Sequence, residues 1–151
     1  MRVGLNGFGR IGRQALRAIF QRHPEVELVG INDLLSLDMA SHLLRFDSNY
    51  GRYPGTVEVG NDTLIVDGQE IPFLSERSWA QLPWSDIGAD VVIEATGAGT
   101  QRESAAQHLD AGAKKVLISA PSKDADLTVV LGVNQTTYDA NEHHVVSNAS
   151  C

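Results

Sequence analysis

Three glycines near the start of the chain have the spacing of a turn that binds phosphate groups. Gly7, Gly9 and Gly12 form the pattern G-x-G-x-x-G within "GFGRIG". In such a turn the first glycine permits the tight bend, the second lets the backbone approach a pyrophosphate, and the third lets the helix lie close to the strand. The pattern alone is a weak signal, so its value depends on a strand before it and a helix after it.

An acid follows this turn at the distance that a dinucleotide requires. Asp33 lies 21 residues beyond Gly12, directly after the apolar run "VELVGIN". Its carboxylate could accept hydrogen bonds from the hydroxyls of an adenosine ribose, while a 2′-phosphate would meet a like charge, so NAD is favoured over NADP. The N–H groups of Arg10 and Ile11, at the positive end of the helix, would face the pyrophosphate. The alternative is that the glycines only turn the chain and Asp33 caps the next helix.

Six short runs rich in apolar and β-branched residues indicate the strands that would position these groups. They are residues 2–8, 26–32, 90–96, 115–120, 127–134 and 144–149. Runs without polar alternation are typical of strands covered on both faces, and therefore of a mostly parallel sheet. Thr96-Gly97 and Ser119-Ala120 also lie at the carboxyl ends of predicted strands, which is the ligand edge of such a sheet. Each pair alone is equally consistent with a plain turn, but together they favour one elongated ligand.

Amphipathic segments between these runs predict three helices. The first is at 10–23, with Ile11, Ala15, Ala18 and Ile19 on the buried face and the arginines on the other. The second is at 36–46, with Ser36 as its N-cap and Met39, Ala40, Leu43 and Leu44 facing inward, and the third is at 100–112, ended by Gly112.

The segment 47–75 differs because it alternates residue types and contains turn signals at 60–62 and 67–68. It predicts a hairpin leading into a further strand, "IPFLS", in which Pro72 indicates an edge position. We therefore predict an α/β fold, with a doubly wound, mostly parallel Rossmann sheet of six strands and a small β-hairpin insertion. The length of 151 residues suits one domain, residues 1–151.

Composition excludes several classes of protein. The net charge is -7 and no basic run exceeds Lys114-Lys115, which argues against nucleic-acid and acidic-membrane partners. One cysteine and five scattered histidines give no zinc-type spacing, so we expect no metal site. No apolar stretch approaches about 20 residues, and the first ten residues lack the apolar region of a signal sequence, so we expect a cytoplasmic protein.

Along its whole length the sequence resembles the N-terminal, NAD-binding part of the phosphorylating glyceraldehyde-3-phosphate dehydrogenases. The matching stretches, in order, are "VGLNGFGRIGR", "INDL", "LLRFDSNYGRYPG", "EATG", "AGAKKVLIS" and "VVSNASC". The resemblance implies a cytoplasmic glycolytic enzyme that oxidises a phosphorylated aldehyde, passes a hydride to NAD and adds inorganic phosphate. It also implies a homotetramer for the full-length enzyme.

The resemblance assigns roles to single residues. Cys151 matches the family's nucleophile, whose thiolate attacks the aldehyde to give a hemithioacetal, and Ser150 would help to bind phosphate. The residues that would hold NAD are Asn6, Gly7, Gly9, Arg10, Ile11, Asp33, Arg77, Thr96, Gly97 and Ser119. Arg77 would lie near the adenine, although a solvated surface charge is an equal alternative.

In the family a second domain follows this cysteine and supplies the histidine base and the phosphate-binding arginines. The sequence stops at Cys151, so we expect the catalytic domain to be absent and the polypeptide to bind NAD without turnover.

Two other interpretations of the function stay open. One is erythrose-4-phosphate dehydrogenase, which "ERSWAQLPW" and "LTVVLGVN" resemble. The other is a non-catalytic NAD-binding module.

Overall fold

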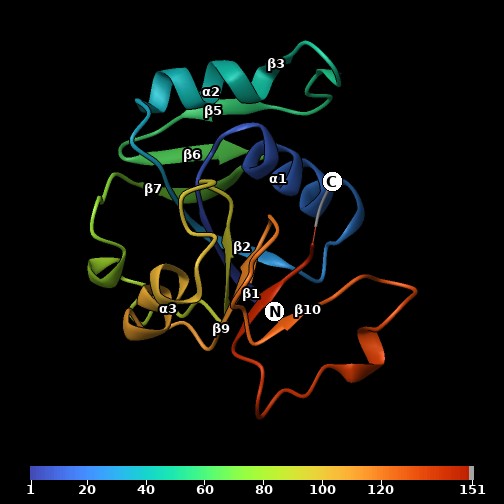
Figure 1. Cartoon of the computed structure of the whole chain (residues 1–151). Coiled ribbons are helices and arrows are strands. Elements are labelled where there is room, and N and C mark those ends of the chain that lie inside the picture. Colours follow the sequence, from blue (N-terminus) through green and yellow to red (C-terminus); the bar gives the residue numbers. More distant parts are fainter. Residues whose placement is uncertain (150–151) are drawn as a thin grey trace.

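A computed structural model describes residues 1–149 and shows a twisted sheet with helices on both faces (Figure 1). The sheet has nine strands in the order β10-β11-β9-β8-β1-β2-β7-β6-β5. The central strands are β1 (Arg2–Asn6), β2 (Glu27–Asn32), β8 (Val91–Glu94) and β9 (Lys115–Ile118), flanked by β11 (Val145–Ser147) and β10 (Leu127–Thr128) on one side and by β7 (Gln69–Leu74), β6 (Thr63–Val66) and β5 (Val57–Val59) on the other. A separate two-stranded sheet joins β3 (Phe46–Asp47) and β4 (Gly51–Arg52).

The strands from β10 to β7 pair in parallel, whereas β7, β6 and β5 form an antiparallel meander. This confirms the predicted α/β, doubly wound, mostly parallel sheet. Two details of the strand pairing were wrong. The sheet has nine strands rather than six, because the six apolar runs and β7 all enter it and the hairpin strands β5 and β6 join it as well. Pro72 is not at an edge, since β7 pairs with both β2 and β6; its pairing with β2 begins only at Phe73, so the missing N–H of Pro72 precedes that ladder.

The predicted strand at 127–134 is reduced to Leu127–Thr128. Asn134 ends it, because its side chain accepts a hydrogen bond from the amide of Val130 (2.7 Å) and donates one to the carbonyl of Thr128 (2.9 Å), which folds the backbone into a turn. Gly132 adopts a positive φ of 85° there. A 3₁₀ turn (Gln135–Thr137) follows.

Helix α1 (Arg10–Arg22) packs on the face of the sheet presented by Val3 and Leu5 of β1. The prediction for its buried face was partly wrong. Leu16 and Ile19 are buried, but Ile11 is 56% exposed and Ala18 is exposed, whereas Arg13 and Arg17 are buried. The physical reason is that backbone carbonyls accept hydrogen bonds from both buried guanidinium groups.

The other two helices lie where the sequence predicts them. Ser36 caps α2 (Leu37–Arg45) by accepting a hydrogen bond from the amide of Met39 at 3.3 Å, as predicted, although Met39 itself is 47% exposed. Helix α3 (Arg102–Asp110) covers the opposite face with the chain around Trp84, which packs against Gly4 of β1. The chain turns after α3 at Gly112, where φ is 100°.

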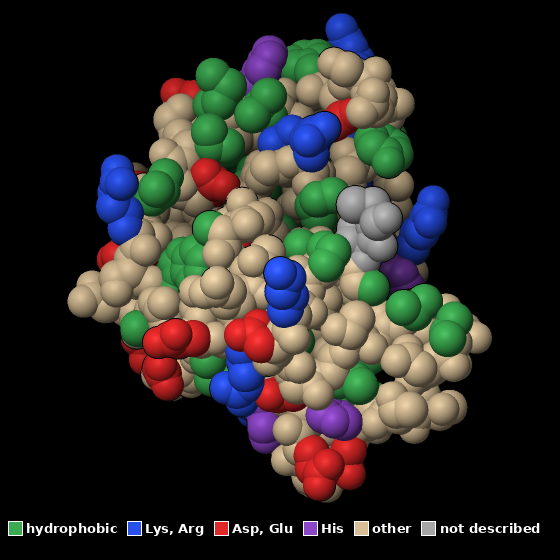
Figure 2. Space-filling view, in the orientation of Figure 1, with side chains coloured by type: hydrophobic (Ala, Val, Ile, Leu, Met, Phe, Trp, Pro, Cys, Tyr) green, Lys and Arg blue, Asp and Glu red, His purple; other side chains and the backbone are tan. Residues whose placement is uncertain are grey.

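Charges on the surface are mixed. On the face shown in Figure 2, the described Lys and Arg side chains are scattered among acidic and apolar ones and form no continuous basic surface. Within residues 1–149, no helix combines the length and the apolar character needed to cross a membrane.

Candidate functional site

The glycine-rich turn connects the end of β1 to the start of α1, and two of its glycines are required by the backbone. Gly7 has a φ of 98°, and its amide donates to the carbonyl of Asn32 at 2.8 Å. A Cβ at Gly7 would lie 2.6 Å from the carbonyl carbon of Ala95, and one at Gly12 would lie 2.0 Å from the carbonyl oxygen of Gly7. These glycines therefore allow the tight turn and the close helix that the sequence predicts.

Gly9 differs because its side of the turn is open. A Cβ there would meet no heavy atom within 4 Å, and its φ of -71° is ordinary for any residue. Gly9 is the N-cap of α1, and no side chain among residues 1–149 caps this helix; its first turn also contains no acid. The N–H groups and the positive end of the helix dipole are therefore available to an anion.

Asp33 joins this turn to the end of β2. Its Oδ2 accepts a hydrogen bond from the amide of Phe8 at 2.5 Å, and its Oδ1 accepts one from the amide of Leu35 at 2.9 Å. A carboxylate offers about four acceptor positions, so both oxygens keep capacity for ligand hydroxyls. The alternative in which Asp33 caps the next helix is wrong, because Ser36 is the N-cap of α2.

These groups line one cleft of about 470 Å³ at the carboxyl edge of the sheet. Its lining residues are Asn6, Gly7, Gly9, Asn32, Asp33, Leu34, Glu76, Arg77, Trp79, Ala95, Thr96 and Ala98. The structure thus brings together six of the predicted residues, from the ends of β1, β2, β7 and β8. These strand ends therefore line one continuous cleft, which would suit one elongated ligand.

The remaining predicted residues lie outside this lining. Arg10 and Ile11 begin α1, and their side chains are exposed. Gly97 takes a φ of 80° in the turn after β8. Ser119 follows β9, and its hydroxyl donates to the carbonyl of Glu94 at 3.0 Å. Ser150 and Cys151 lie outside the residues that the structure describes.

The described chain leading toward Cys151 leaves the sheet at this same edge. β11 pairs in parallel with β9, where Ser147 lies opposite Ile118, and the amide of Asn148 donates to the carbonyl of Ile118 at 3.1 Å. The end of β11 is therefore the neighbour of the strand end that carries Ser119.

Sequence reasoning missed six lining residues. Asn32, Leu34, Ala95 and Ala98 are neighbours in sequence of residues that were predicted. Glu76 and Trp79 follow β7, and recognising that β7 ends at the same edge would have found them.

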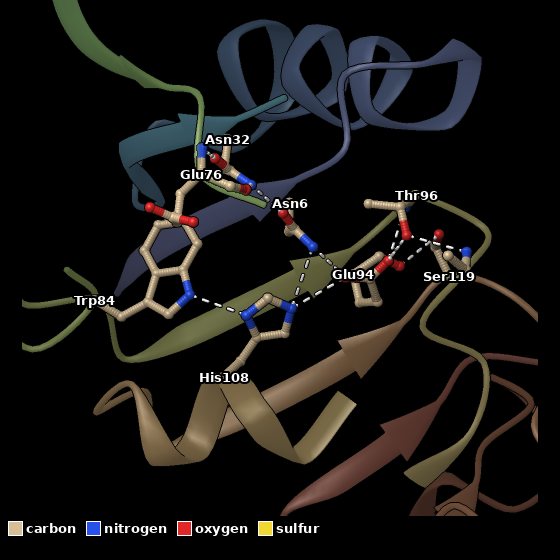
Figure 3. A network of polar contacts seen from close by, with 9 residues as sticks. Asn6, Asn32, Glu76, Trp84, Glu94, Thr96, His108 and Ser119 are labelled. Carbon is tan, nitrogen blue, oxygen red and sulfur yellow. Dashed lines mark hydrogen bonds and ion pairs between the residues drawn. The ribbon is translucent and has the colours of Figure 1, made fainter. Parts of the chain in front are cut away.

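Polar side chains also form a row beneath the cleft (Figure 3). Asn32 donates to Asn6 Oδ1 at 2.7 Å and accepts a hydrogen bond from the amide of Glu76 at 2.8 Å. Asn6 in turn donates to Glu94 Oε2 at 2.5 Å. Burial raises the pKa of Glu94, but the hydrogen bonds from His108, Thr96 and Asn6 outweigh it, so this pKa lies below its ordinary value and the group is a carboxylate.

Two other hollows are less suited to a dinucleotide. One, of about 660 Å³, has a mainly apolar lining that includes Leu117, Val129, Leu131 and Val146. The other, of about 400 Å³, lies between the outer face of α1 and residues 50–54. Neither contains a glycine-rich turn or a helix N-terminus.

Comparison with known proteins agrees with this geometry. The family model described as "Glyceraldehyde 3-phosphate dehydrogenase, NAD binding domain" matches residues 1–102. Glyceraldehyde-3-phosphate dehydrogenases of Geobacillus stearothermophilus and Streptomyces coelicolor are 52% and 51% identical over 151 residues, and glyceraldehyde-3-phosphate dehydrogenase 1 of Bacillus subtilis is 50% identical. Each match covers 100% of this chain and 45% of the relative, so the chain spans less than half of their length. The chain belongs to the glyceraldehyde-3-phosphate dehydrogenase family and carries its NAD-binding domain.

Proposed function

We propose that residues 1–151 form the NAD-binding domain of a phosphorylating glyceraldehyde-3-phosphate dehydrogenase, and that the cleft described above holds the NAD. The observation that carries this proposal is the open, uncapped start of α1 at Gly9, in the same cleft as the carboxylate of Asp33. A cleft of this kind suits a ligand with an anionic centre and a ribose beside it.

The residues present fit the dinucleotide. The amides of Arg10 and Ile11 would bind the pyrophosphate, and the carboxylate of Asp33 would accept from the adenosine ribose. Arg77, which is exposed at the rim, would lie near the adenine. Thr96, Gly97 and Ser119 would then flank the nicotinamide end.

In the complete protein, bound NAD would supply an acceptor for hydride. The thiolate of Cys151 would attack the aldehyde carbon to give a hemithioacetal, and loss of its hydride would leave a thioester. Inorganic phosphate, held with the help of Ser150, would then split this thioester and release the thiolate. The names of the relatives favour glyceraldehyde 3-phosphate as the substrate. The homotetramer and the cytoplasmic location are parts of the same proposal.

Calorimetric titration with NAD tests the cleft through Gly9→Ala. The added methyl group meets no protein atom, so the free energy of unfolding should stay within about 0.5 kcal/mol of the original. The same methyl group lies where the pyrophosphate must approach, so we expect the affinity to fall roughly tenfold or more. Gln21→Ala, on the exposed side of α1, is the control. Unchanged NAD affinity in Gly9→Ala would overturn the proposal.

A second titration compares NAD with NADP. The charge of Asp33 opposes a 2′-phosphate, so NADP should bind roughly tenfold more weakly or worse. Asp33→Asn keeps the shape of the side chain and should narrow this preference. Equal affinity for both dinucleotides in the unsubstituted chain would contradict the role given to Asp33.

A further inference from the structure

Two ionisable side chains with no role in the proposed function are buried directly beneath the cleft. His108, in the last turn of α3, and Glu94, the last residue of β8, have side-chain exposures of 0% and 1%. Their Nε2 and Oε2 atoms lie 3.0 Å apart. Figure 3 shows that they lie in one chain of polar contacts with Trp84 on one side and Asn6 and Thr96 on the other.

The hydrogen bond between Trp84 and His108 shows which ring nitrogen of His108 carries the proton. The indole Nε1 of Trp84 can only donate, and it lies 3.0 Å from Nδ1 of His108. Nδ1 is therefore an acceptor, and the proton of the neutral ring is on Nε2, directed at Glu94. The amide nitrogen of Asn6 lies 3.3 Å from the same Nε2, and since both groups donate, both hydrogens point to the carboxylate.

Glu94 is the terminal acceptor of the whole chain. Its Oε2 accepts from His108 and Asn6, and its Oε1 accepts from the amide of Thr96 at 2.8 Å and from the hydroxyl of Thr96. These four donors fill about all the acceptor positions that a carboxylate has. Glu94 therefore fixes the groups around it and has no position left for a ligand.

Two of the groups that Glu94 fixes line the cleft. The hydroxyl of Thr96 gives its hydrogen to Glu94 and accepts one from the amide of Ala98 at 3.0 Å, which shapes the turn after β8. Asn6 holds Asn32, which holds the backbone of Glu76 on the far side of the cleft. The positions of Thr96, Asn6 and Asn32, which line the cleft, therefore depend on the buried carboxylate of Glu94.

The packing leaves Glu94 little room to move. A Cβ on Gly99 would lie 2.7 Å from both Cγ and Cδ of Glu94. Trp79, which lines the cleft, stacks on the ring of His108 with centroids 5.3 Å apart and an interplanar angle of 16°. The network therefore reaches the cleft through Trp79 as well as through Asn6 and Thr96.

We propose that Glu94 and His108 are positioning residues for the cofactor: the N–H of His108 holds the carboxylate of Glu94, and Glu94 sets Asn6 and Thr96 in the geometry that binds the dinucleotide. This inference rests on the proposed function, because it concerns the same cleft. The N–H that His108 gives to Glu94 matters for binding. Loss of the Trp84 contact should affect stability and not binding, because the carboxylate of Glu94 by itself keeps the proton of His108 on Nε2.

Two substitutions of His108 separate these contacts. The amide nitrogen of His108→Gln can occupy the place of Nε2 and donate to Glu94, while its bond with Trp84 is lost. The amide oxygen of His108→Asn can occupy the place of Nδ1 and accept from Trp84, while the donor to Glu94 is lost. Both remove the ring that stacks on Trp79, so they are matched controls for each other.

Calorimetric titration with NAD is the readout. His108→Asn should weaken binding roughly tenfold, the scale of losing a hydrogen bond to a charged group, and His108→Gln should stay within about threefold of the unsubstituted chain. The NMR signal of the Trp84 indole N–H should move in His108→Gln and stay near its position in His108→Asn. Equal NAD affinity in the two variants, whether lowered or not, would overturn the proposal and leave the network a purely structural role.

If either His108 variant does not fold, Glu94→Gln and Trp84→Phe make the same comparison. Glu94→Gln puts an NH₂ group among donors and should weaken NAD binding roughly tenfold, whereas Trp84→Phe removes only the remote N–H and should not exceed about threefold. Equal affinities would again overturn the inference. Failure of the proposed function is distinguishable, because then the unsubstituted chain would not bind NAD or Gly9→Ala would bind it normally.

Discussion

Charged side chains are buried on both faces of the central sheet, and they serve different purposes. On the α3 face, Glu94 accepts hydrogen bonds from the side chains of Asn6 and Thr96, which line the cofactor cleft. On the α1 face, Arg13 donates to the carbonyl of Phe8 at 2.8 Å, and Arg17 donates to the carbonyls of Leu44 (2.8 Å) and Gly51 (3.0 Å). The first set orients side chains of the site. In the second set, Arg13 supports the glycine-rich turn through Phe8, whereas Arg17 joins backbone segments that lie outside the cleft.

The two sets also differ in how completely they are satisfied. Glu94 is surrounded by donors and has a lowered pKa, as described above. The Nε atoms of Arg13 and Arg17 have no hydrogen-bond partner among residues 1–149. Burial lowers the pKa of Arg13, and the negative charges of Asp47 and Asp33 offset only part of this effect. The comparison shows that a buried charge affects the cofactor site when its hydrogen-bond partners belong to that site, and that burial alone is not enough.

Arg17→Ala should give the largest loss of stability. It removes two charge-assisted hydrogen bonds and leaves the carbonyls of Leu44 and Gly51 without their donor, so we expect a loss of about 3 kcal/mol in the free energy of unfolding. Urea denaturation measures it, with the exposed Arg22→Ala as control. NAD affinity should not change. Weakened NAD binding in a folded Arg17→Ala protein would break the distinction between the two faces.

Glu94→Gln should give a smaller loss of stability together with a loss of binding. We expect about 2 kcal/mol in urea denaturation, because an amide group replaces an acceptor for several donors. Ile71→Val, a core change in β7 away from the network, is the control for stability loss alone. Should Ile71→Val lower NAD affinity as much as Glu94→Gln does, binding would depend on stability and not on the network.

The pH dependence of the unfolding free energy tests whether Glu94 is held as a carboxylate. The pKa of Glu94 is lower in the folded chain than its ordinary value of 4.5, so its contribution to stability is complete above about pH 4.5 and is lost as the pH falls through the folded pKa. The difference in unfolding free energy between the chain and Glu94→Gln should therefore shrink as the pH falls from about 6 to about 3. A difference that stays constant would mean that Glu94 is not held as a carboxylate.

Tyr53→Phe should have the smallest effect, on the α1 face. The hydroxyl of Tyr53 donates to Asp67 at 2.7 Å, and the ring lies 5.6 Å from the guanidinium carbon of Arg17. Burial, and then the contact with Asp67, raises the pKa of Tyr53, so it is a neutral donor at ordinary pH. Loss of this one bond should cost about 1 kcal/mol in urea denaturation and leave NAD affinity unchanged. A loss above about 3 kcal/mol would show that the hydroxyl also supports the hydrogen bonds that Arg17 donates to Leu44 and Gly51.

The glycine-rich turn and Asp33 could be predicted from the sequence because backbone geometry restricts which residues can occupy them. A φ of 98° at Gly7 and a 2.0 Å approach at Gly12 tolerate no side chain, so these positions are visible as glycines at a fixed spacing. The parallel sheet was equally visible, since strands covered on both faces must be apolar throughout.

The burial of Arg17 and Glu94 could not be predicted, because most of their partners are distant in sequence. Arg17 depends on carbonyls 27 and 34 residues away, and amphipathic periodicity places an arginine on the outer face by default. Glu94 and His108 are an acid and a histidine 14 residues apart, with no spacing that marks a network. The prediction of a strand over 127–134 was wrong for a different reason. The side chain of Asn134 forms hydrogen bonds with the backbone of this segment in place of strand hydrogen bonds, and Leu131 is exposed.

A crystal structure of the chain with bound NAD tests the central claim most directly. We predict the pyrophosphate within hydrogen-bond distance of the amides of Arg10 and Ile11, with the adenosine ribose on Asp33 and with Glu94 still bonded to Asn6, Thr96 and His108. A dinucleotide bound at another surface, or one bound in the cleft with the Glu94 network broken, would contradict the account.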